Sequence, residues 1–398
     1  MEKLSKMKHC RIDPTTASRD EILAEISRLE LLMNMKSNEE QAIKIFINSV
    51  YGATASPFFV GYNVRVAEAI TLQGQEMIKF VQKIVNRYFS EFWHRDKELH
   101  DKLGLSRVER ITNEVAIYGD TDSCYVTFQD AVYGCDWQGD PRQLILKIYE
   151  YRLKDYLEKS FSQLSASMGT DNIQNLEMET ISYSAIFLKK KKYVLDMSWK
   201  SGEGDGIFYE PGTKIKATGV EIAQSSTPTF ARAKLKELLK IILSERNKLN
   251  MRKFAELLKT EKESFMLDNI ENVSMSSNVN DYEKGIMDDR KHFEIQSGCP
   301  MHVRAAGYHN YLLNSSKWKG KYQLIKSGDK VRYYYAQNKY GGENVFAYLP
   351  GNYPVEFAPP VDYETQFAKS IVDPINRFIS AMGLPPLSPE LIVKTQLF

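Results

Sequence analysis

The chain has 398 residues, of which 43% are hydrophobic and 26% charged, and its formal net charge is +2. It contains no apolar run near the roughly 20 residues that span a bilayer, and residues 1–6 lack the apolar stretch of a signal peptide, which argues against a membrane protein and makes the cytoplasm the default location. The four cysteines lack the C-x-x-C spacing of a zinc site, and they suggest no disulfide framework.

The first part of the chain has the apolar spacing of long helices. Ile22, Ile26, Leu29 and Met33 recur at helical intervals, and a similar pattern runs through residues 43–50. Residues 48–59 contain Gly, Ser and Pro and predict a break, after which residues 66–81 resume a helix.

The middle of the chain predicts strands. Two short apolar segments, residues 114–118 and 124–128, flank a Gly-Asp-Thr-Asp turn and indicate a β-hairpin. Residues 144–164 favour a helix, residues 177–194 return to strand composition, and residues 202–206 predict a second hairpin turn. We expect residues 1–220 to mix helices with antiparallel strands.

A domain boundary is predicted near residues 218–221, where a loop-rich passage leads into charged helices. The apolar positions from residue 230 onward follow the helical period, so this part is expected to be largely α-helical. Residues 331–335 are rich in tyrosine and predict a strand near its end. The predicted fold class of the whole chain is therefore α+β.

Asp120 and Asp122 are the strongest candidates for metal ligands. They lie two residues apart, and side chains at positions i and i+2 of an extended segment point to the same side. Two carboxylates placed in this way suit Mg²⁺, which substrate phosphates then help to coordinate. An acidic turn in solvent would have the same two residues, so the surrounding sequence has to decide.

The surrounding sequence resembles family B DNA polymerases. Tyr118-Gly119-Asp120-Thr121-Asp122-Ser123 is similar to the family's third motif, which lies on a β-hairpin of the palm. Upstream, Lys44-x-x-x-Asn48-Ser49-x-Tyr51-Gly52 is similar to the second motif, on a fingers helix. The two motifs follow each other in the expected order.

The resemblance implies roles for these residues. Asp120 and Asp122 would hold two Mg²⁺ ions for template-directed transfer of a nucleotide from a deoxynucleoside triphosphate (dNTP) to a primer 3′-hydroxyl. Lys44, one helical turn before Asn48, would carry charge for the incoming triphosphate. Tyr51 and Gly52 would shape the pocket of the new base pair.

Further positions are similar to the family's DNA-binding residues. Lys190, Lys191 and Tyr193 belong to a basic run that resembles the primer-binding motif, in which lysines neutralise phosphates and the aromatic ring supplies a platform; the alternative is a solvated edge. Glu177 and Glu179, expected on a strand, are either accessory carboxylates near the metals or glutamates turned to solvent.

The end of the chain looks most like polymerases of T-even-like bacteriophages. The segment Cys299-Pro300-x-His302-x-Arg304 belongs to the resemblance to their palm-to-thumb region, and His302 and Arg304 are either DNA phosphate contacts or packing residues. The terminal Gln396, Leu397 and Phe398 would bind a sliding clamp, or else form a frayed end.

The resemblance also implies an architecture like a right hand. Residues 1–55 would form the end of the fingers, residues 56–220 an antiparallel-sheet palm, and residues 221–398 a mainly α-helical thumb with its tail. The family's first motif, of the type Asp-x-x-Ser-x-Tyr-Pro, supplies the other catalytic aspartate and does not occur in the chain; nor do the exonuclease carboxylates.

We therefore expect negligible synthesis by this chain alone. Its initial methionine and polar start favour a naturally split polymerase, whose N-terminal subunit brings the first motif, further fingers residues and the 3′–5′ exonuclease. An engineered fragment or an incomplete sequence is the alternative. A catalytically silent subunit that binds DNA or a clamp is the competing function, and a Mg²⁺-dependent nuclease fits less well because it needs no nucleotide-binding helix.

Overall fold

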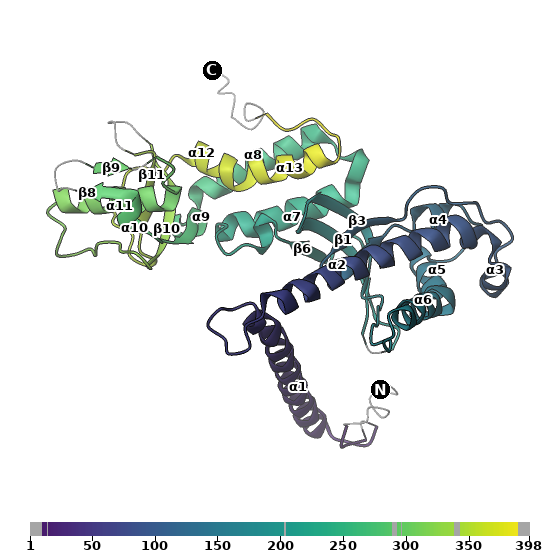
Figure 1. Ribbon diagram of the computed structural model, residues 1–398. Helices are drawn as coiled ribbons and strands as arrows, with labels where there is room; N and C mark the ends of the chain where they lie inside the picture. Colours follow the sequence, from purple (N-terminus) through teal and green to yellow (C-terminus); the bar gives the residue numbers. More distant parts are fainter. Residues whose placement is uncertain are drawn as a thin grey trace. The chain divides into compact units, whose positions relative to one another are not determined.

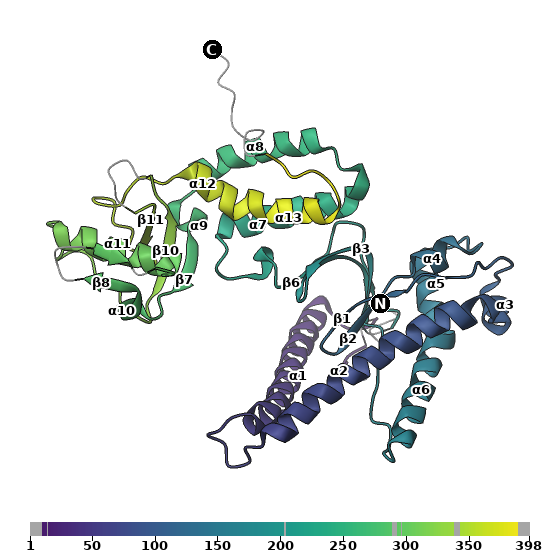
Figure 2. The same ribbon diagram turned by 45° about the horizontal axis from the view of Figure 1, so that its top comes forward.

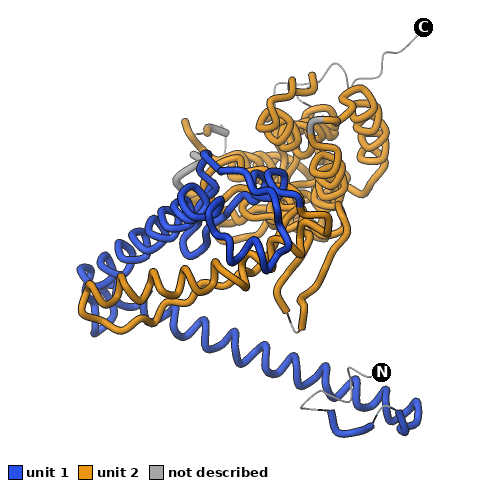
Figure 3. Tube along the Cα trace, turned by 90° about the vertical axis from the view of Figure 1, so that its right-hand side faces the viewer, with its two compact units in different colours: residues 1–136 blue, residues 137–398 orange. Residues whose placement is uncertain are grey.

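A computed structural model of the chain describes residues 10–13, 15–202, 204–288, 293–295, 297–337 and 343–388 (Figure 1). The chain divides into two compact units, residues 1–136 and residues 137–398 (Figure 3). The division at residues 55 and 220 stays a prediction. Gln396, Leu397 and Phe398 lie outside the described residues. Among the helices in the described ranges, none is both long and apolar enough to cross a membrane.

The first unit begins with two long helices, α1 (Arg19–Thr54) and α2 (Val64–Arg87). Ser18 caps the start of α1, and the side chain of Asn63 caps α2 by accepting a hydrogen bond from the backbone N–H of Val66. The break between the helices starts later than predicted, because α1 continues through Gly52 to Thr54. A single glycine is tolerated inside a helix, whereas the proline at residue 57 disfavours helical backbone at the residue before it.

The rest of the first unit packs around the carboxyl-terminal half of α2. It contains η1 (Tyr88–Phe92), η2 (Trp93–Arg95), α3 (Lys97–Leu103), the antiparallel strands β1 (Ala116–Asp120) and β2 (Ser123–Val126), and α4 (Gln129–Tyr133). The strands confirm the predicted hairpin. The core is aromatic and aliphatic, and its fully or nearly fully buried side chains include Val81, Val85, Tyr88, Phe89, Trp93, Leu99 and Val115.

The second unit opens with a helical stretch and a four-stranded antiparallel sheet. The stretch comprises α5 (Pro141–Ile148), η3 (Tyr149–Leu153) and α6 (Lys154–Ser167), which confirms the helix predicted over residues 144–164. The strands are β3 (Thr180–Lys189), β4 (Lys192–Lys200), β5 (Ile207–Phe208) and β6 (Ile215–Thr218). Strand β4 pairs with each of the other three, so it is the centre of this sheet.

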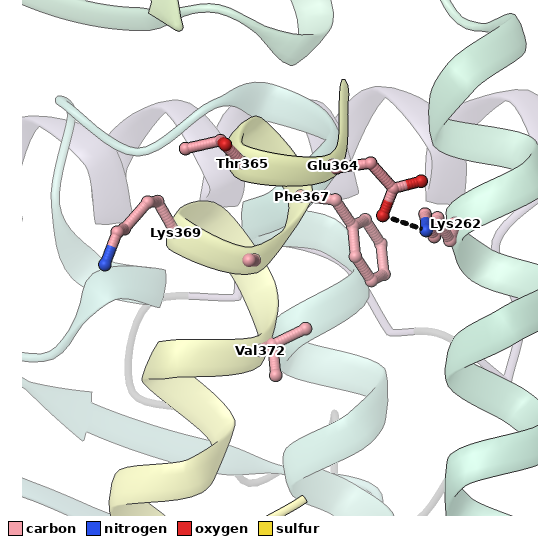
Figure 4. Close-up of a pocket in the computed structure, with 7 residues that line it drawn as sticks. Lys262, Glu364, Thr365, Phe367, Lys369 and Val372 are labelled. Atoms are coloured by element: carbon pink, nitrogen blue, oxygen red, sulfur yellow. Dashed lines mark hydrogen bonds and ion pairs between the residues drawn. The ribbon is translucent and has the colours of Figure 1, made fainter. Parts of the chain in front are cut away.

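Long helices cover the sheet and supply the main core of the second unit. α7 (Thr229–Glu245), α8 (Met251–Leu267) and the continuous run of α12 (Tyr363–Phe367), η6 (Ala368–Val372) and α13 (Asp373–Ala381) lie side by side in two views (Figures 1 and 2). Their buried residues include Leu239, Leu258, Ile371 and Phe378, and they pack with Val194 of β4. Lys262 of α8 forms an ion pair with Glu364 of α12 beside a small pocket (Figure 4).

A second, three-stranded sheet lies in the later part of this unit, which was predicted to be largely α-helical. Its strands, in spatial order, are β11 (Val345–Tyr348), β10 (Lys330–Tyr335) and β7 (Met275–Asn278), and α11 (Met301–Ser315) packs on it. β10 confirms the predicted tyrosine-rich strand. The shorter elements are η4 (Glu221–Ala223), η5 (Arg246–Lys248), α9 (Ile270–Val273), α10 (Tyr282–Gly285), β8 (Ile286–Asp288) and β9 (Phe293–Ile295). The α+β class is confirmed.

The tip of the β3–β4 hairpin depends on Gly219. This residue follows β6, has a φ of +63°, and approaches the tip so closely that a Cβ atom on it would lie 2.0 Å from the backbone oxygen of Lys191. Any side chain at this position would push the tip away from β6. The lack of a side chain at residue 219 therefore allows β6 to lie close to the basic tip.

We expect Gly219→Ala to lower the free energy of unfolding of the second unit by about 2–5 kcal/mol, because it adds a collision to the left-handed backbone. Gly212→Ala is the matched control: Gly212 has a φ of +72° but no atom within 4 Å of its Cβ position, so only the backbone penalty of about 1–2 kcal/mol applies. Urea-induced unfolding of both variants measures the difference. Equal losses would contradict a collision at Lys191.

Candidate active site

Asp120 and Asp122 lie at the tip of the β1–β2 hairpin. Asp120 is the last residue of β1 and pairs with Ser123, so only Thr121 and Asp122 form the turn. The backbone N–H of Asp122 donates to the Asp120 carbonyl over 2.7 Å, and the Ser123 hydroxyl donates to the same carbonyl over 3.1 Å. The turn is therefore tight and tied to the end of β1.

Thr121 has a φ of +56°. Two-residue hairpin turns with a positive φ at the first central residue normally carry glycine there, and a β-branched residue in this region is an outlier. Such strain clusters at functional sites, where the surrounding structure has to maintain it. The local backbone therefore adds a physical reason to regard this tip as functional.

The two carboxylates differ in their surroundings. The Asp122 side chain is exposed in the turn, whereas Asp120 is half-buried and its Oδ1 accepts a hydrogen bond from the Thr121 hydroxyl over 3.2 Å. The predicted reason for their pairing, alternation along a strand, does not apply, because Asp120 ends β1 and Asp122 belongs to the turn. Two carboxylates fit part of a Mg²⁺ site, whose hard oxygen ligands they supply.

Other possible metal ligands near the tip do not complete the set. No group of three or more His, Cys, Asp or Glu side chains that could hold a metal ion occurs in the part of the chain that the structure describes. Cys124 follows the turn, but burial raises the pKa of its thiol to about 11. It therefore stays protonated at neutral pH, and a thiol binds metals only as the thiolate.

The predicted nucleotide-binding residues lie on the last turns of α1. Lys44, Asn48 and Tyr51 are spaced i, i+4 and i+7, so they share one face of the helix. Because α1 continues to Thr54, Tyr51 and Gly52 belong to this helix and not to a following loop. No atom lies within 4 Å of the Cβ position of Gly52, which leaves open space beside Tyr51.

Lys44 already has a partner within its own helix. Its ammonium lies 2.5 Å from Glu40 Oε1, and this hydrogen bond lowers the pKa of the Glu40 carboxyl. Both side chains are more than half exposed, at 63% and 65%, so the pair is weak and solvent-screened. A polyanion can replace Glu40 at little cost.

The basic run forms the tip of the β3–β4 hairpin in the second unit. Lys189 pairs with Lys192, so Lys190 and Lys191 are the turn, and both side chains are exposed. Tyr193 is only 4% exposed, and its ring lies 5.6 Å from that of Phe187. The ring therefore offers little surface to DNA, because β4 is a central strand and buries its side chains, and the role of Tyr193 in primer binding stays a prediction.

Glu177 and Glu179 were predicted to lie on a strand. In the structure they precede β3, which begins at Thr180. Both side chains are exposed, and Glu177 Oε1 accepts a hydrogen bond from Asn175 over 2.9 Å. This arrangement fits the alternative in which both glutamates point to solvent. They belong to the second unit and the aspartates to the first, so a shared metal site stays a prediction.

Arg304 and His302 lie on α11. Arg304 Nη2 is 2.5 Å from Glu343 Oε2 and 3.3 Å from Asn344 Oδ1. Burial lowers the pKa of His302, and its ring lies 6.1 Å from that of Tyr333. The packing alternative therefore accounts for His302, and Arg304 could meet DNA only by exchanging Glu343.

One polar residue beneath the hairpin was not predicted from the sequence. The side-chain oxygen of Asn86, on α2, accepts hydrogen bonds from the backbone N–H groups of Val115 and Ala116 over 2.9 and 2.8 Å. Asn86 lies about 30 residues before its partners and in neither motif, so only the tertiary structure reveals it.

Comparison with known proteins gives consistent matches. Residues 17–134 match the sequence profile of DNA polymerase family B. The DNA-directed DNA polymerase of Escherichia phage RB69 is 26% identical over 369 residues, 86% of this chain and 36% of that protein. That of Enterobacteria phage T4 is 24% identical over 379 residues, 90% of this chain and 39% of that protein.

A DNA polymerase catalytic subunit of Human herpesvirus 7 (strain JI) is 26% identical over 217 residues, 54% of this chain and 18% of that protein. The chain spans less than two-fifths of the length of each of these three relatives.

We expect Thr121→Gly to leave the thermal unfolding midpoint of the first unit unchanged or slightly higher. Glycine removes a steric penalty of about 1–2 kcal/mol and loses about 0.5–1 kcal/mol through the greater freedom of the unfolded chain. Thr121→Pro, which fixes φ near −65°, should lower the midpoint by several degrees. If both variants lower it equally, the positive φ at residue 121 is contradicted.

Proposed function

We propose that the chain is a member of DNA polymerase family B and forms the carboxyl-terminal part of a DNA-directed DNA polymerase. The observation that carries the proposal is the aspartate pair of the Tyr118–Ser123 motif at the tip of a tight, strained hairpin. A continuous helix that presents Lys44, Asn48 and Tyr51 on one face supports it. The proposed reaction is attack of a primer 3′-hydroxyl on the α-phosphate of a dNTP, with release of pyrophosphate.

We propose that Asp120 and Asp122 contribute oxygen ligands to two Mg²⁺ ions, which when bound neutralise charge on the phosphates and activate the primer hydroxyl. The exposed carboxylate of Asp122 is accessible from solvent at the tip, while the half-buried Asp120 is fixed by the strand that carries it. A fixed and an accessible ligand together suit a site that binds a new substrate in each cycle.

The face of α1 would bind the incoming nucleotide. Lys44 would exchange Glu40 for the triphosphate and offset charge on the leaving pyrophosphate. The ring of Tyr51, 40% exposed, and the open space at Gly52 would border the new base pair. Asn48 lies between Lys44 and Tyr51 on the same face of α1. Lys190 and Lys191 would hold phosphates of the primer strand, and Arg304 stays a weaker candidate.

We further propose that an N-terminal subunit completes the enzyme with the first catalytic motif and the 3′–5′ exonuclease. Exposed apolar side chains on α1 and on the following loop support a protein partner: Met33 and Phe46 are each 70% exposed, Phe58 98% and Val60 101%. Large exposed apolar patches mark interaction sites in soluble proteins. Docking on a sliding clamp through Gln396, Leu397 and Phe398 stays part of the proposal.

A catalytically silent DNA- or clamp-binding subunit is the second candidate. It needs the basic tip of the β3–β4 hairpin but gives no reason for the strained turn between Asp120 and Ser123. Decay of the catalytic site would release that strain, since nothing would maintain a threonine at a φ of +56°. The polymerase proposal accounts for both features.

Primer extension tests the proposal directly. A primed template, Mg²⁺ and four dNTPs are incubated with the chain alone, with a lysate of its source, and with the lysate plus Asp122→Asn or Asp101→Asn. We expect added synthesis only in the mixture of chain and lysate, reduced to the lysate background by Asp122→Asn, which removes one ligand charge. Asp101→Asn, on the exposed surface of α3, should leave it unchanged.

Synthesis by the chain alone would refute the need for a partner. Lack of added synthesis in every mixture would favour the silent subunit.

A second prediction concerns the salt dependence of DNA binding, which needs no catalysis. Replacing both Lys190 and Lys191 by Gln should lower the slope of log Kd against log salt concentration by about 1–2. Fluorescence anisotropy with a labelled primer-template measures Kd. Lys200→Gln, exposed at the far end of β4, is the matched control and should change the slope little. The same slope in both variants would exclude a specific role of the tip.

A further inference from the structure

The hairpin that carries Asp120 and Asp122 needs support from outside its own strands. In the described part of the chain, β1 and β2 form a two-stranded sheet with no third strand. A two-stranded hairpin is at best marginally stable by itself. The tip can hold its carboxylates in a fixed place only if another element fixes the strands.

Helix α2 contacts both strands. At the base of the hairpin, Asn86 Oδ1 accepts the backbone N–H groups of Val115 and Ala116 over 2.9 and 2.8 Å. Val115 is 1% exposed, and its carbonyl accepts the N–H of Thr127 over 2.8 Å. One side-chain oxygen thus sets where β1 begins and, through Val115, where β2 ends.

The same face of α2 also touches the hairpin nearer its tip. A Cβ atom on Gly119 would lie 2.8 Å from Gln82 Nε2 and 3.4 Å from Ile78 Cγ1. Ile78, Gln82 and Asn86 are spaced i, i+4 and i+8, so they form one row along the helix. Glycine at position 119 lets the strand lie directly on this row, one residue before Asp120.

We propose that Asn86 is a positioning residue for the metal-binding aspartates, a role that rests on the proposed function. Its loss leaves two backbone N–H groups at the base of β1 without an acceptor, one of them on the buried Val115, and an unpaired polar group away from water is unfavourable. Strand β1 then shifts to find new acceptors, and the shift is carried to Asp120 four residues later. Residues that orient metal ligands typically change activity by about 10–100-fold.

The test uses three variants of the full chain. Asn86→Leu keeps the size of the side chain but removes the acceptor, whereas Asn86→Asp retains an oxygen that can accept both N–H groups. Asn63→Ala removes the amino-terminal cap of the same helix, where Asn63 Oδ1 accepts the Val66 N–H over 3.3 Å. This last variant is the matched control for weakening α2 without touching the hairpin.

The first readout is amide hydrogen exchange of the chain by itself, followed by mass spectrometry. We expect Asn86→Leu to speed amide exchange in residues 113–127 and Asn86→Asp to keep the exchange there as slow as in the wild type. Asn63→Ala should change exchange only at the start of α2. Unchanged exchange in residues 113–127 for Asn86→Leu would overturn the proposal. So would equal acceleration throughout the first unit, which would make Asn86 an ordinary stabilising residue.

The second readout is primer extension with the completing subunit present. Asn86→Leu should lower kcat by about 10–100-fold and change KM for the dNTP by less than about threefold, because the nucleotide face of α1 is untouched. Asn86→Asp should recover most of kcat. A change confined to KM would contradict a role in placing the carboxylates. If the wild-type mixture makes no DNA, the proposed function fails, and the exchange experiment still decides whether Asn86 anchors the hairpin.

Discussion

Two strands that pair only with each other cannot fix their own position, and the proposed chemistry of this chain depends on where the tip of such a pair lies. The hairpin of β1 and β2 is held from below by α2, through Asn86 at its base and the close approach at Gly119. The carboxyl-terminal half of α2 is in turn held by the aromatic core around Phe89 and Trp93. The position of the proposed metal ligands is therefore a property of this core as much as of the aspartates.

The basic β3–β4 hairpin of the second unit is held in position in a different way. β4 pairs with β3 on one side and with β5 and β6 on the other, and the helices α7 and α13 pack against the sheet. The tip at Lys190 and Lys191 needs no polar anchor, because the sheet and its core fix it and Gly219 allows β6 to approach. Tyr193 serves this packing, which explains why its ring is buried.

The two tips share a backbone feature. Thr121 and Lys191 are two of the four residues other than glycine that have a positive φ in the described ranges, with φ values of 56° and 59°. Glycine would relieve the strain at both positions. A threonine that donates to Asp120 and an exposed lysine stand there instead, in keeping with strain retained where a side chain has a task.

The sequence by itself determined the local features of this protein. Apolar periodicity predicted the long helices, and the alternation of strand and turn predicted the β1–β2 hairpin and the pairing of β4 with β5, because these depend on neighbouring residues. The turn at Lys190 and Lys191 was not predicted, since residues 177–194 have strand composition throughout, and the structure divides them between β3 and β4. The two motifs could be recognised because their residues are close together in sequence. Residues 48–54 were misjudged, since one glycine does not end a helix whose other residues favour it, and Glu177 and Glu179 were placed on a strand that begins only at Thr180.

Only the tertiary structure decided what surrounds each predicted residue. Tyr193 is buried because its strand is the central one of its sheet. The pairing of Arg304 with Glu343 and the hydrogen bonds of Asn86 beneath the hairpin join residues that are far apart in sequence. Spacing along the chain carries no information about such contacts. They arise when elements pack, because a polar group removed from water must find its partner wherever the fold brings one within hydrogen-bonding distance.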